Sequence, residues 1–268
     1  MPYSTRNGLK IHYEIHGEGH PLVLIHANPF DRRLWLYQIA RFSPFYRVIA
    51  VDLRGYGLSD KPEIPFTLRD MMDDVLGVCH DQGVGEAIFA GVSVGSGIAL
   101  LTALDHPERT KAIVLVGGSS SGPRNPETIV AGFDPDDPGA YMMTLMRGYV
   151  APGFADTPQG KWLLDLFVEN SAHLSSKCIA QIFRTRGNFD MTARLGEVKT
   201  PTLVINGEYD ESLEAGRLTA SRIANARHVV LPNTGHACCI EDAPAFDQAM
   251  ISFLADHHLI PEGALKHR

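Results

Sequence analysis

Short apolar runs alternate with longer amphipathic stretches over the first half of the chain. A run of about five apolar residues bounded by turn residues is typical of a strand whose two faces are both buried. Four such runs, and one stretch in which apolar and polar residues alternate, predict strands at residues 10–16, 21–26, 47–51, 86–90 and 111–116.

Two segments between these runs have the pattern of helices, residues 67–82 and residues 96–106. Thr67 is a suitable N-cap for the first helix, with Asp70 three residues further on, and Pro107 ends the second helix. Strands that alternate with helices in this way predict a parallel sheet covered by helices on both faces.

The alternation stops after Gly117. Residues 138–186 have a helical pattern without clear strands, and the alternation then resumes with strands at 202–206 and 228–231 and helices at 214–223 and 243–257. We therefore predict one α/β core domain, residues 1–119 and 196–268, interrupted by a helical cap at residues 120–195. Aromatic and methionine side chains in such an insertion can line an apolar ligand pocket, so Trp162 and Met143 are predicted to bind substrate.

Composition and charge argue against several other classes of protein. The 268 residues include 24 Lys and Arg against 31 Asp and Glu, a formal net charge of −7, and no long basic run that would bind nucleic acid. No apolar run approaches the ~20 residues of a membrane-spanning helix, and the N-terminal residues lack the apolar stretch of a signal peptide. With four irregularly spaced cysteines, we expect a cytoplasmic protein that binds neither nucleic acid nor membrane; a homodimer is left open.

A serine between two glycines is the sharpest chemical motif. It lies directly between the predicted strand at 86–90 and the following helix, where a tight turn would expose the serine hydroxyl above the sheet and near a helix N-terminus. Phosphate-binding motifs fit less well, because Leu100 stands where a dinucleotide fingerprint needs its third glycine and no Gly-Lys-Ser/Thr occurs. The motif is Gly91-Val92-Ser93-Val94-Gly95.

A nucleophilic serine needs a base, and the base needs an acid that orients it. His236 follows the predicted strand at 228–231, and Asp210 follows the predicted strand at 202–206. Ligands bind at the carboxyl ends of strands in such sheets, and the chain order serine, aspartate, histidine is that of α/β-hydrolases. We therefore predict that Ser93, Asp210 and His236 form a catalytic triad.

Taken together, these motifs resemble those of the α/β-hydrolase fold, and the resemblance covers nearly the whole chain. It implies an α/β-hydrolase fold with a mostly parallel central sheet, helices on both faces and a helical cap. By position, the resemblance also implies an oxyanion hole made by the backbone N–H groups of Asn28 and Val94. The chain departs from the usual His-Gly-x motif because Ala27 stands in the glycine position. The resemblance rests on residues 22–29 and 52–60, the serine turn, residues 207–210, and Gly235-His236.

The residues 26–29 also resemble the HGxP loop of epoxide hydrolases and haloalkane dehalogenases. Those enzymes use an aspartate nucleophile, whereas Ser93 suits attack on a carbonyl carbon. The overall resemblance is to enol-lactonases, carboxylesterases and meta-cleavage carbon–carbon hydrolases. We expect a serine hydrolase that cleaves a small acyl substrate, an ester or a lactone, without a metal or other cofactor. The alternatives are a meta-cleavage C–C hydrolase, a cofactor-free perhydrolase or haloperoxidase-like enzyme, and a non-catalytic ligand receptor on a hydrolase scaffold.

Overall fold

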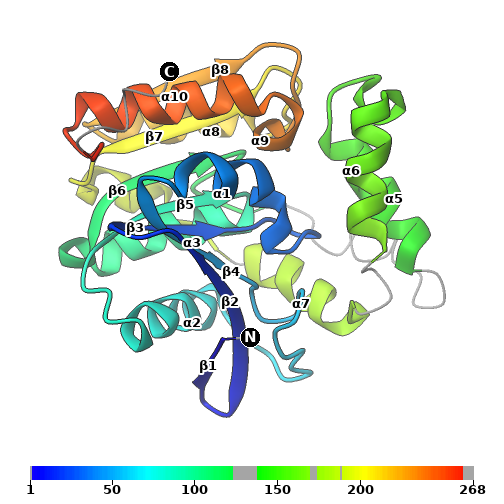
Figure 1. The fold of residues 1–268 in the computed structure, drawn as a ribbon, viewed down its shortest axis with the longest axis horizontal. Helices are drawn as coiled ribbons and strands as arrows, with labels where there is room; N and C mark the ends of the chain where they lie inside the picture. Colours follow the sequence, from blue (N-terminus) through cyan, green and yellow to red (C-terminus); the bar gives the residue numbers. More distant parts are fainter. Residues whose placement is uncertain (1, 123–137, 170–173, 188, 262–268) are drawn as a thin grey trace.

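The computed structural model describes residues 2–122, 138–169, 174–187 and 189–261. Within these residues, eight strands form one sheet in the order β1-β2-β4-β3-β5-β6-β7-β8 (Figure 1). β1 pairs antiparallel with β2 and β2 with β4, and every other pair is parallel, as expected for an α/β-hydrolase fold. The strands are β1 (Tyr3–Arg6), β2 (Leu9–His16), β3 (His20–Ile25), β4 (Tyr46–Val51), β5 (Ala87–Val92), β6 (Thr110–Val116), β7 (Thr202–Gly207) and β8 (Ala226–Leu231).

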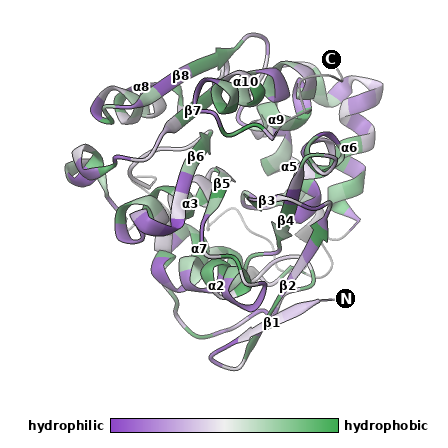
Figure 2. Cartoon of the chain, turned by 60° about the vertical axis from the view of Figure 1, so that its left-hand side comes forward, coloured by the Kyte–Doolittle hydropathy of each residue, from purple (hydrophilic) through white to green (hydrophobic). Residues whose placement is uncertain are grey.

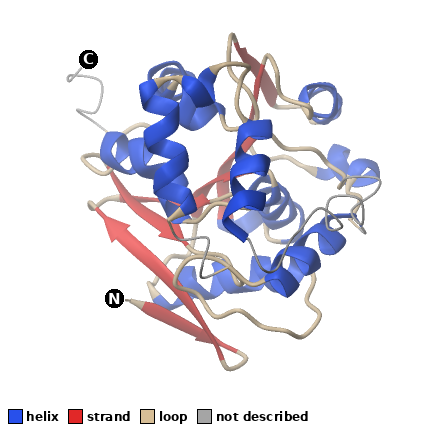
Figure 3. Ribbon diagram, turned by 90° about the vertical axis from the view of Figure 1, so that its right-hand side faces the viewer, coloured by secondary structure: helices blue, strands red, loops and turns tan. Residues whose placement is uncertain are grey.

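The hydrophobic core lies on both faces of this sheet. Leu22 and Leu24 of β3 belong to one buried cluster, whereas Val23 and Ile25 belong to the other, because successive side chains of a strand point to opposite faces. Helices lie on both faces of the sheet, as Figure 3 shows, and hydrophobic colouring is strong along the central strands in Figure 2. One cluster includes α2 (Leu68–Asp81) and α3 (Val94–Asp105), and the other includes residues of α1 (Leu36–Phe42) and α10 (Ala243–Asp256).

The start of α2 follows the prediction closely. The Thr67 hydroxyl accepts a hydrogen bond from the Asp70 N–H at 3.2 Å, and Asp70 Oδ2 accepts one from the Thr67 N–H at 2.7 Å. This reciprocal pair is a capping box, which satisfies two backbone donors that the first helical turn would otherwise leave unpaired.

Other elements differ from the prediction in extent or were not predicted. β5 runs on to Val92 and α3 begins at Val94, so that Ser93 alone separates the strand from the helix. The sequence pattern did not identify β1 or α1, both of which are short. The remaining predicted strands and helices of the core agree with the structure to within two residues, including α8 (Leu213–Arg222), which packs on β7 and β8.

The chain between β6 and β7 forms helices and, in its described part, no strand. These helices are α5 (Pro138–Tyr149), α6 (Pro158–Val168) and α7 (Ser176–Gly187). An isolated bridge pairs Ser121 with Asp190, so the chain leaves the core and returns to it at one point. In Figure 1, α5 and α6 lie together beside the core. We call residues 120–195 the inserted segment; its residues 123–137, 170–173 and 188 lie outside the described ones. No described helix has the length and apolar character needed to cross a membrane.

Candidate active site

Ser93 has a backbone conformation that few residues other than glycine adopt. Its φ is 54° and its ψ is −110°, at the junction of β5 and α3. The two neighbouring glycines are required by close backbone contacts: a Cβ on Gly91 would lie 2.1 Å from the Gly95 carbonyl oxygen, and one on Gly95 would lie 2.3 Å from the Ile25 carbonyl oxygen. The strained turn therefore depends on the glycines that the sequence motif contains.

His236 and Asp210 form a direct, buried hydrogen bond. Nδ1 of His236 lies 2.9 Å from Oδ1 of Asp210, and the two side chains come from the loops after β8 and β7. The Asp210 carboxylate also accepts hydrogen bonds from the N–H and hydroxyl of Ser212, both at 2.8 Å, and from Nδ2 of Asn206 at 2.9 Å. Burial alone would raise the pKa of Asp210, but the hydrogen bond with His236, its charge and these other donors lower that pKa to about 2.

One cavity of about 380 Å³ brings the predicted residues together at the carboxyl ends of the strands. Ser93 and His236 line it, as do Asn28 and Val94, while Asp210 lies behind the imidazole and is 5% exposed. The remaining lining residues are Gly117, Ser119, Ser121, Gly122, Tyr149, Ile182, Phe183, Glu211, Ser212 and Ala215.

The end of β6 passes close beneath the imidazole. Gly117 has a φ of +53°, and a Cβ placed on it would lie 2.8 Å from Nδ1 and 2.9 Å from Cε1 of His236. Only glycine leaves the histidine ring its present position, so Gly117 belongs to the structural support of the site.

A second buried histidine, His26, fixes the loop after β3, which carries Asn28. Nδ1 of His26 donates to the Ala27 carbonyl oxygen at 2.8 Å, and its Nε2 accepts from the Leu53 N–H at 2.9 Å, so the loop after β3 is bound to the loop after β4. Burial lowers the pKa of His26, which favours the neutral ring that this pattern requires. The Tyr56 hydroxyl donates to Oδ1 of Asn28, a residue that is 4% exposed.

Several lining residues were not identified from the sequence. Tyr149, the last residue of α5, places its ring 5.0 Å from the His236 ring with an interplanar angle of 34°. Burial raises the pKa of the Tyr149 phenol, and so does the charge of Glu211, whereas the neighbouring Asn28 amide lowers it. Ile182 and Phe183 come from α7. The amphipathic pattern of this helix indicates which face is buried, but it does not indicate which cavity that face lines.

The two residues predicted to bind substrate from the inserted segment do not line this cavity. Trp162 is 55% exposed, because α6 turns its neighbours Leu163, Leu164 and Phe167 inward. Met143 is half-buried and packs against the core cluster that contains Met142. Their assignment as lining residues is therefore corrected: Tyr149, Ile182 and Phe183 are the contributions of α5 and α7.

The arrangement combines a strained hydroxyl, an imidazole and a buried carboxylate around one cavity, which is chemistry suited to nucleophilic hydrolysis. Within the described residues, no group of three or more His, Cys, Asp or Glu side chains could hold a metal ion. Fold and site together define an α/β-type hydrolase.

Comparison with known proteins agrees with this class. Residues 22–248 match the alpha/beta hydrolase family, and the chain belongs to that family. It is 29% identical over 262 residues to a 2-hydroxy-6-oxononadienedioate/2-hydroxy-6-oxononatrienedioate hydrolase of Paraburkholderia phymatum, covering 92% of this chain and 91% of the relative. A 2-hydroxy-6-oxo-6-phenylhexa-2,4-dienoate hydrolase of Burkholderia cepacia is 26% identical, with 93% of each chain covered.

Among solved structures, the enol-lactonase from Burkholderia xenovorans superposes with a TM-score of 0.88 and 26% identity, covering 95% of this chain and all of the other. These similar proteins are hydrolases, and we conclude that this chain is a hydrolase.

Proposed function

We propose that the protein is a serine hydrolase that cleaves a small carboxylic ester or lactone through an acyl-enzyme. The observation that carries this proposal is the shared cavity of Ser93 and His236, with Asp210 hydrogen-bonded to the far side of the imidazole. The Nδ1–H of the ring is then fixed toward the carboxylate, which leaves Nε2 free of a proton and able to act as a base.

In the proposed reaction, Ser93 Oγ attacks the substrate carbonyl carbon while His236 Nε2 takes the hydroxyl proton. The tetrahedral intermediate collapses, the bond to the leaving oxygen breaks, and His236 returns the proton to that oxygen. Water then attacks the acyl-enzyme in the same way, releasing the acid and restoring the Ser93 hydroxyl. Asp210, with its pKa near 2, stays charged throughout and stabilises the imidazolium.

The backbone N–H groups of Asn28 and Val94 are the proposed oxyanion hole. Both residues line the cavity beside Ser93. Val94 is the first residue of α3, so its N–H has no acceptor within the helix. Donors fixed in this way act on the charge that develops in the transition state, and each changes the turnover number by about 10²–10³-fold in comparable sites.

The cavity limits the substrate by size and charge. Its volume of about 380 Å³ suits a small acyl group, and Ile182, Phe183 and Ala215 supply an apolar wall. The inserted segment, which contributes Tyr149 and α7 to this wall, acts in this proposal as a cap that selects the substrate.

Carbon–carbon hydrolysis of a meta-cleavage product is the second candidate, because two of the similar proteins are named as hydrolases of 2-hydroxy-6-oxo unsaturated acids. Their substrates carry carboxylates. Among the described residues that line the cavity there is no Lys or Arg, and Glu211 adds a negative charge, which favours cleavage of an ester or a lactone.

Reaction with a fluorophosphonate, followed by intact mass and peptide mapping, tests the serine mechanism. A single adduct on Ser93, absent from Ser93→Ala, is expected. An adduct on another residue, or full activity after complete labelling elsewhere, would overturn the proposal. A panel of p-nitrophenyl esters, lactones and ring-cleavage dienones then distinguishes the two candidates; turnover of dienones alone would favour C–C hydrolysis.

A further inference from the structure

The end of α5 is in direct backbone contact with the loop that carries His236. The Ala237 N–H donates to the Tyr149 carbonyl oxygen at 2.9 Å. A Cβ placed on Gly235 would lie 2.7 Å from the Val150 carbonyl carbon and 2.9 Å from the Ala151 nitrogen. The glycine before the histidine therefore permits an approach between two backbones that a side chain would prevent.

One carboxylate joins the same two segments. Oε2 of Glu241 accepts from the Ala151 N–H at 2.6 Å, and its Oε1 accepts from the Gly235 N–H at 2.9 Å. Glu241 is the last residue of α9 (Cys238–Glu241), which begins two residues after His236. Burial raises the pKa of Glu241 to about 7, although both N–H donors act in the opposite direction. In its ionised form this carboxylate is a charged acceptor, whose hydrogen bonds are among the stronger ones in proteins, so the bridge fixes the distance between the two segments.

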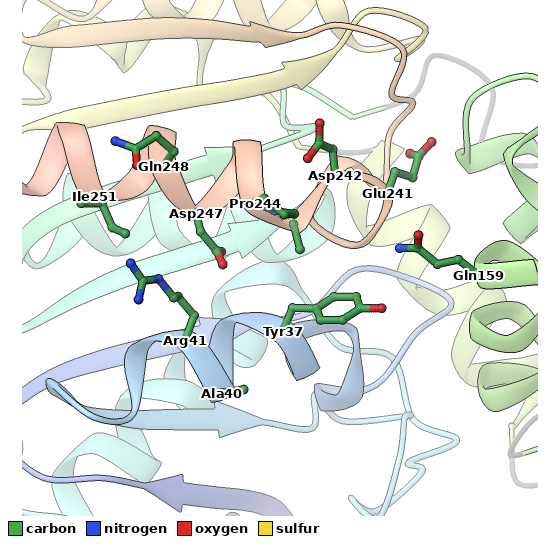
Figure 4. A pocket seen from close by; sticks show the side chains of 11 residues that line it. Tyr37, Ala40, Arg41, Gln159, Glu241, Asp242, Pro244, Asp247, Gln248 and Ile251 are labelled. Atoms are coloured by element: carbon green, nitrogen blue, oxygen red, sulfur yellow. The ribbon is translucent and has the colours of Figure 1, made fainter. Parts of the chain in front are cut away.

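A further contact lies at the same place. Nε2 of Gln159, on α6, donates to the Ile240 carbonyl oxygen at 3.2 Å. Figure 4 shows Gln159 and Glu241, from different elements, at one end of a groove between α1 and α10. The inserted segment is thus bound to the residues after His236 at two points along α9.

We propose that Glu241 is a positioning residue for His236: its carboxylate fixes the end of α5 to the histidine loop and so holds the Tyr149 ring against the imidazole. The ring contact of 5.0 Å lies next to this connection, because Tyr149 is two residues before Ala151. This inference rests on the proposed function, in which His236 is the base. It assigns Glu241 no contact with the substrate.

The test compares Glu241→Ala and Glu241→Gln with Asp242→Ala. Asp242 is the adjacent acid, and its side chain accepts from the Ala245 N–H at 3.1 Å, which caps α10. Asp242→Ala is therefore the matched control for Glu241→Ala: it removes a local hydrogen bond of an adjacent acid but leaves the contacts of the histidine loop unchanged. In Glu241→Gln one oxygen still accepts, but the amide N–H₂ faces the second donor.

We expect Glu241→Ala to lower kcat at pH 8 by about 100-fold with KM changed less than about threefold, because a small displacement of a reacting group costs that much. Glu241→Gln should lie between it and the wild type, and Asp242→Ala should keep the wild-type kcat. The downfield proton signal of the His236–Asp210 hydrogen bond should broaden or shift in Glu241→Ala alone. Equal kcat losses in Glu241→Ala and Asp242→Ala, or an unchanged proton signal, would overturn the proposal.

The rate of fluorophosphonate labelling separates this inference from the proposed function. Wild-type labelling of Ser93 with slow labelling of Glu241→Ala supports both. If the wild type labels at Ser93 and Glu241→Ala labels equally fast, the positioning role is wrong while the serine mechanism stands. If the wild type does not label at Ser93, both are wrong.

Discussion

Asp210 meets His236 through Oδ1, at 2.9 Å from Nδ1, and the same oxygen accepts hydrogen bonds from Ser212. Asp210→Asn keeps the shape of this group but can present an N–H₂ to the ring, which would favour the tautomer that has its proton on Nε2. We expect kcat to fall by about 10⁴-fold with the far-ultraviolet circular dichroism unchanged. Steady-state kinetics on a reactive ester measure the effect, and a loss of less than tenfold would contradict the role of Asp210.

The conformation of Ser93 leads to a prediction about stability. A non-glycine residue at φ 54° and ψ −110° stores about 1–3 kcal/mol of strain, which glycine relieves. Ser93→Gly and Ser93→Ala should both lose turnover, by about 10⁶-fold for a triad nucleophile. Only Ser93→Gly should gain stability, with a Tm about 2–4 °C above that of Ser93→Ala for each kcal/mol relieved. Equal melting temperatures of the two variants in differential scanning calorimetry would argue against strain at this turn.

Asn28 is proposed to act through its backbone, whereas its side chain accepts from the Tyr56 hydroxyl inside the protein. Asn28→Ala keeps the N–H, so kcat should stay within about tenfold of the wild type, well short of the loss expected for a missing oxyanion donor. The free energy of unfolding should fall by about 1–3 kcal/mol, because the Tyr56 hydroxyl loses its buried acceptor.

Tyr56→Phe is the control for this variant. Adding it to Asn28→Ala should recover part of the lost stability, as measured by urea unfolding, since no unpaired hydroxyl is left. If Asn28→Ala instead lowered kcat by about 1000-fold with the fold intact, the amide side chain would be the group that binds the substrate or the oxyanion.

Substrate choice should depend on α7 and not on the exposed face of α6. Phe183→Leu and Ile182→Val shorten side chains of the apolar wall and so enlarge the cavity. Each should raise the relative kcat/KM for longer acyl chains by about tenfold, the effect of one methylene in a fitted pocket. Trp162→Ala removes a side chain that is 55% exposed and should leave the ranking unchanged. A series of p-nitrophenyl esters measures this ranking; a change in Trp162→Ala alone would refute the cavity described above.

Asp247 should make the protein less stable as the pH rises. Burial raises the pKa of this carboxyl to about 6, although a hydrogen bond from Gln38 and the charge of Arg41 act in the opposite direction. A folded-state pKa above the unfolded value of about 3.9 means that its contribution is fully present below pH ~4 and lost as the pH rises through ~6. Asp247→Asn stays neutral, so it should gain about 3 kcal/mol on the wild type between pH 4 and pH 8. Urea unfolding at both pH values measures this, and parallel changes in the two proteins would show that Asp247 does not titrate as described.

The features predicted best from the sequence are those that depend only on residues close together in the chain. The central strands are continuous apolar runs, and Ser93 stands between glycines whose spacing only a tight turn explains. The capping box at Thr67 is likewise a local pattern. These features need no knowledge of the neighbouring elements, which is why they agree with the structure.

The rest depends on long-range packing. α1 has seven residues, and most of its stability comes from the core cluster it packs against and not from its own pattern. In the inserted segment, Trp162 and Leu163 are adjacent on one helix, yet only Leu163 is buried. Hydrophobicity alone could not show which of the two faces inward. Tyr149 is beside His236 at the place where Gly235 and Glu241 contact the residues after α5, a relation between residues far apart in the chain.

The bridge between Ser121 and Asp190 makes the inserted segment exchangeable in a way that the sheet strands are not. Both of its ends meet at one place on the core, so a substitute of another length or shape could be spliced in without any strand changing its neighbour. The core would still impose conditions on every such substitute, among them a backbone donor within reach of Glu241 where Ala151 now stands. Insertions that keep such contacts could diverge elsewhere in sequence, and a family built on this core could acquire new specificities by replacing one module.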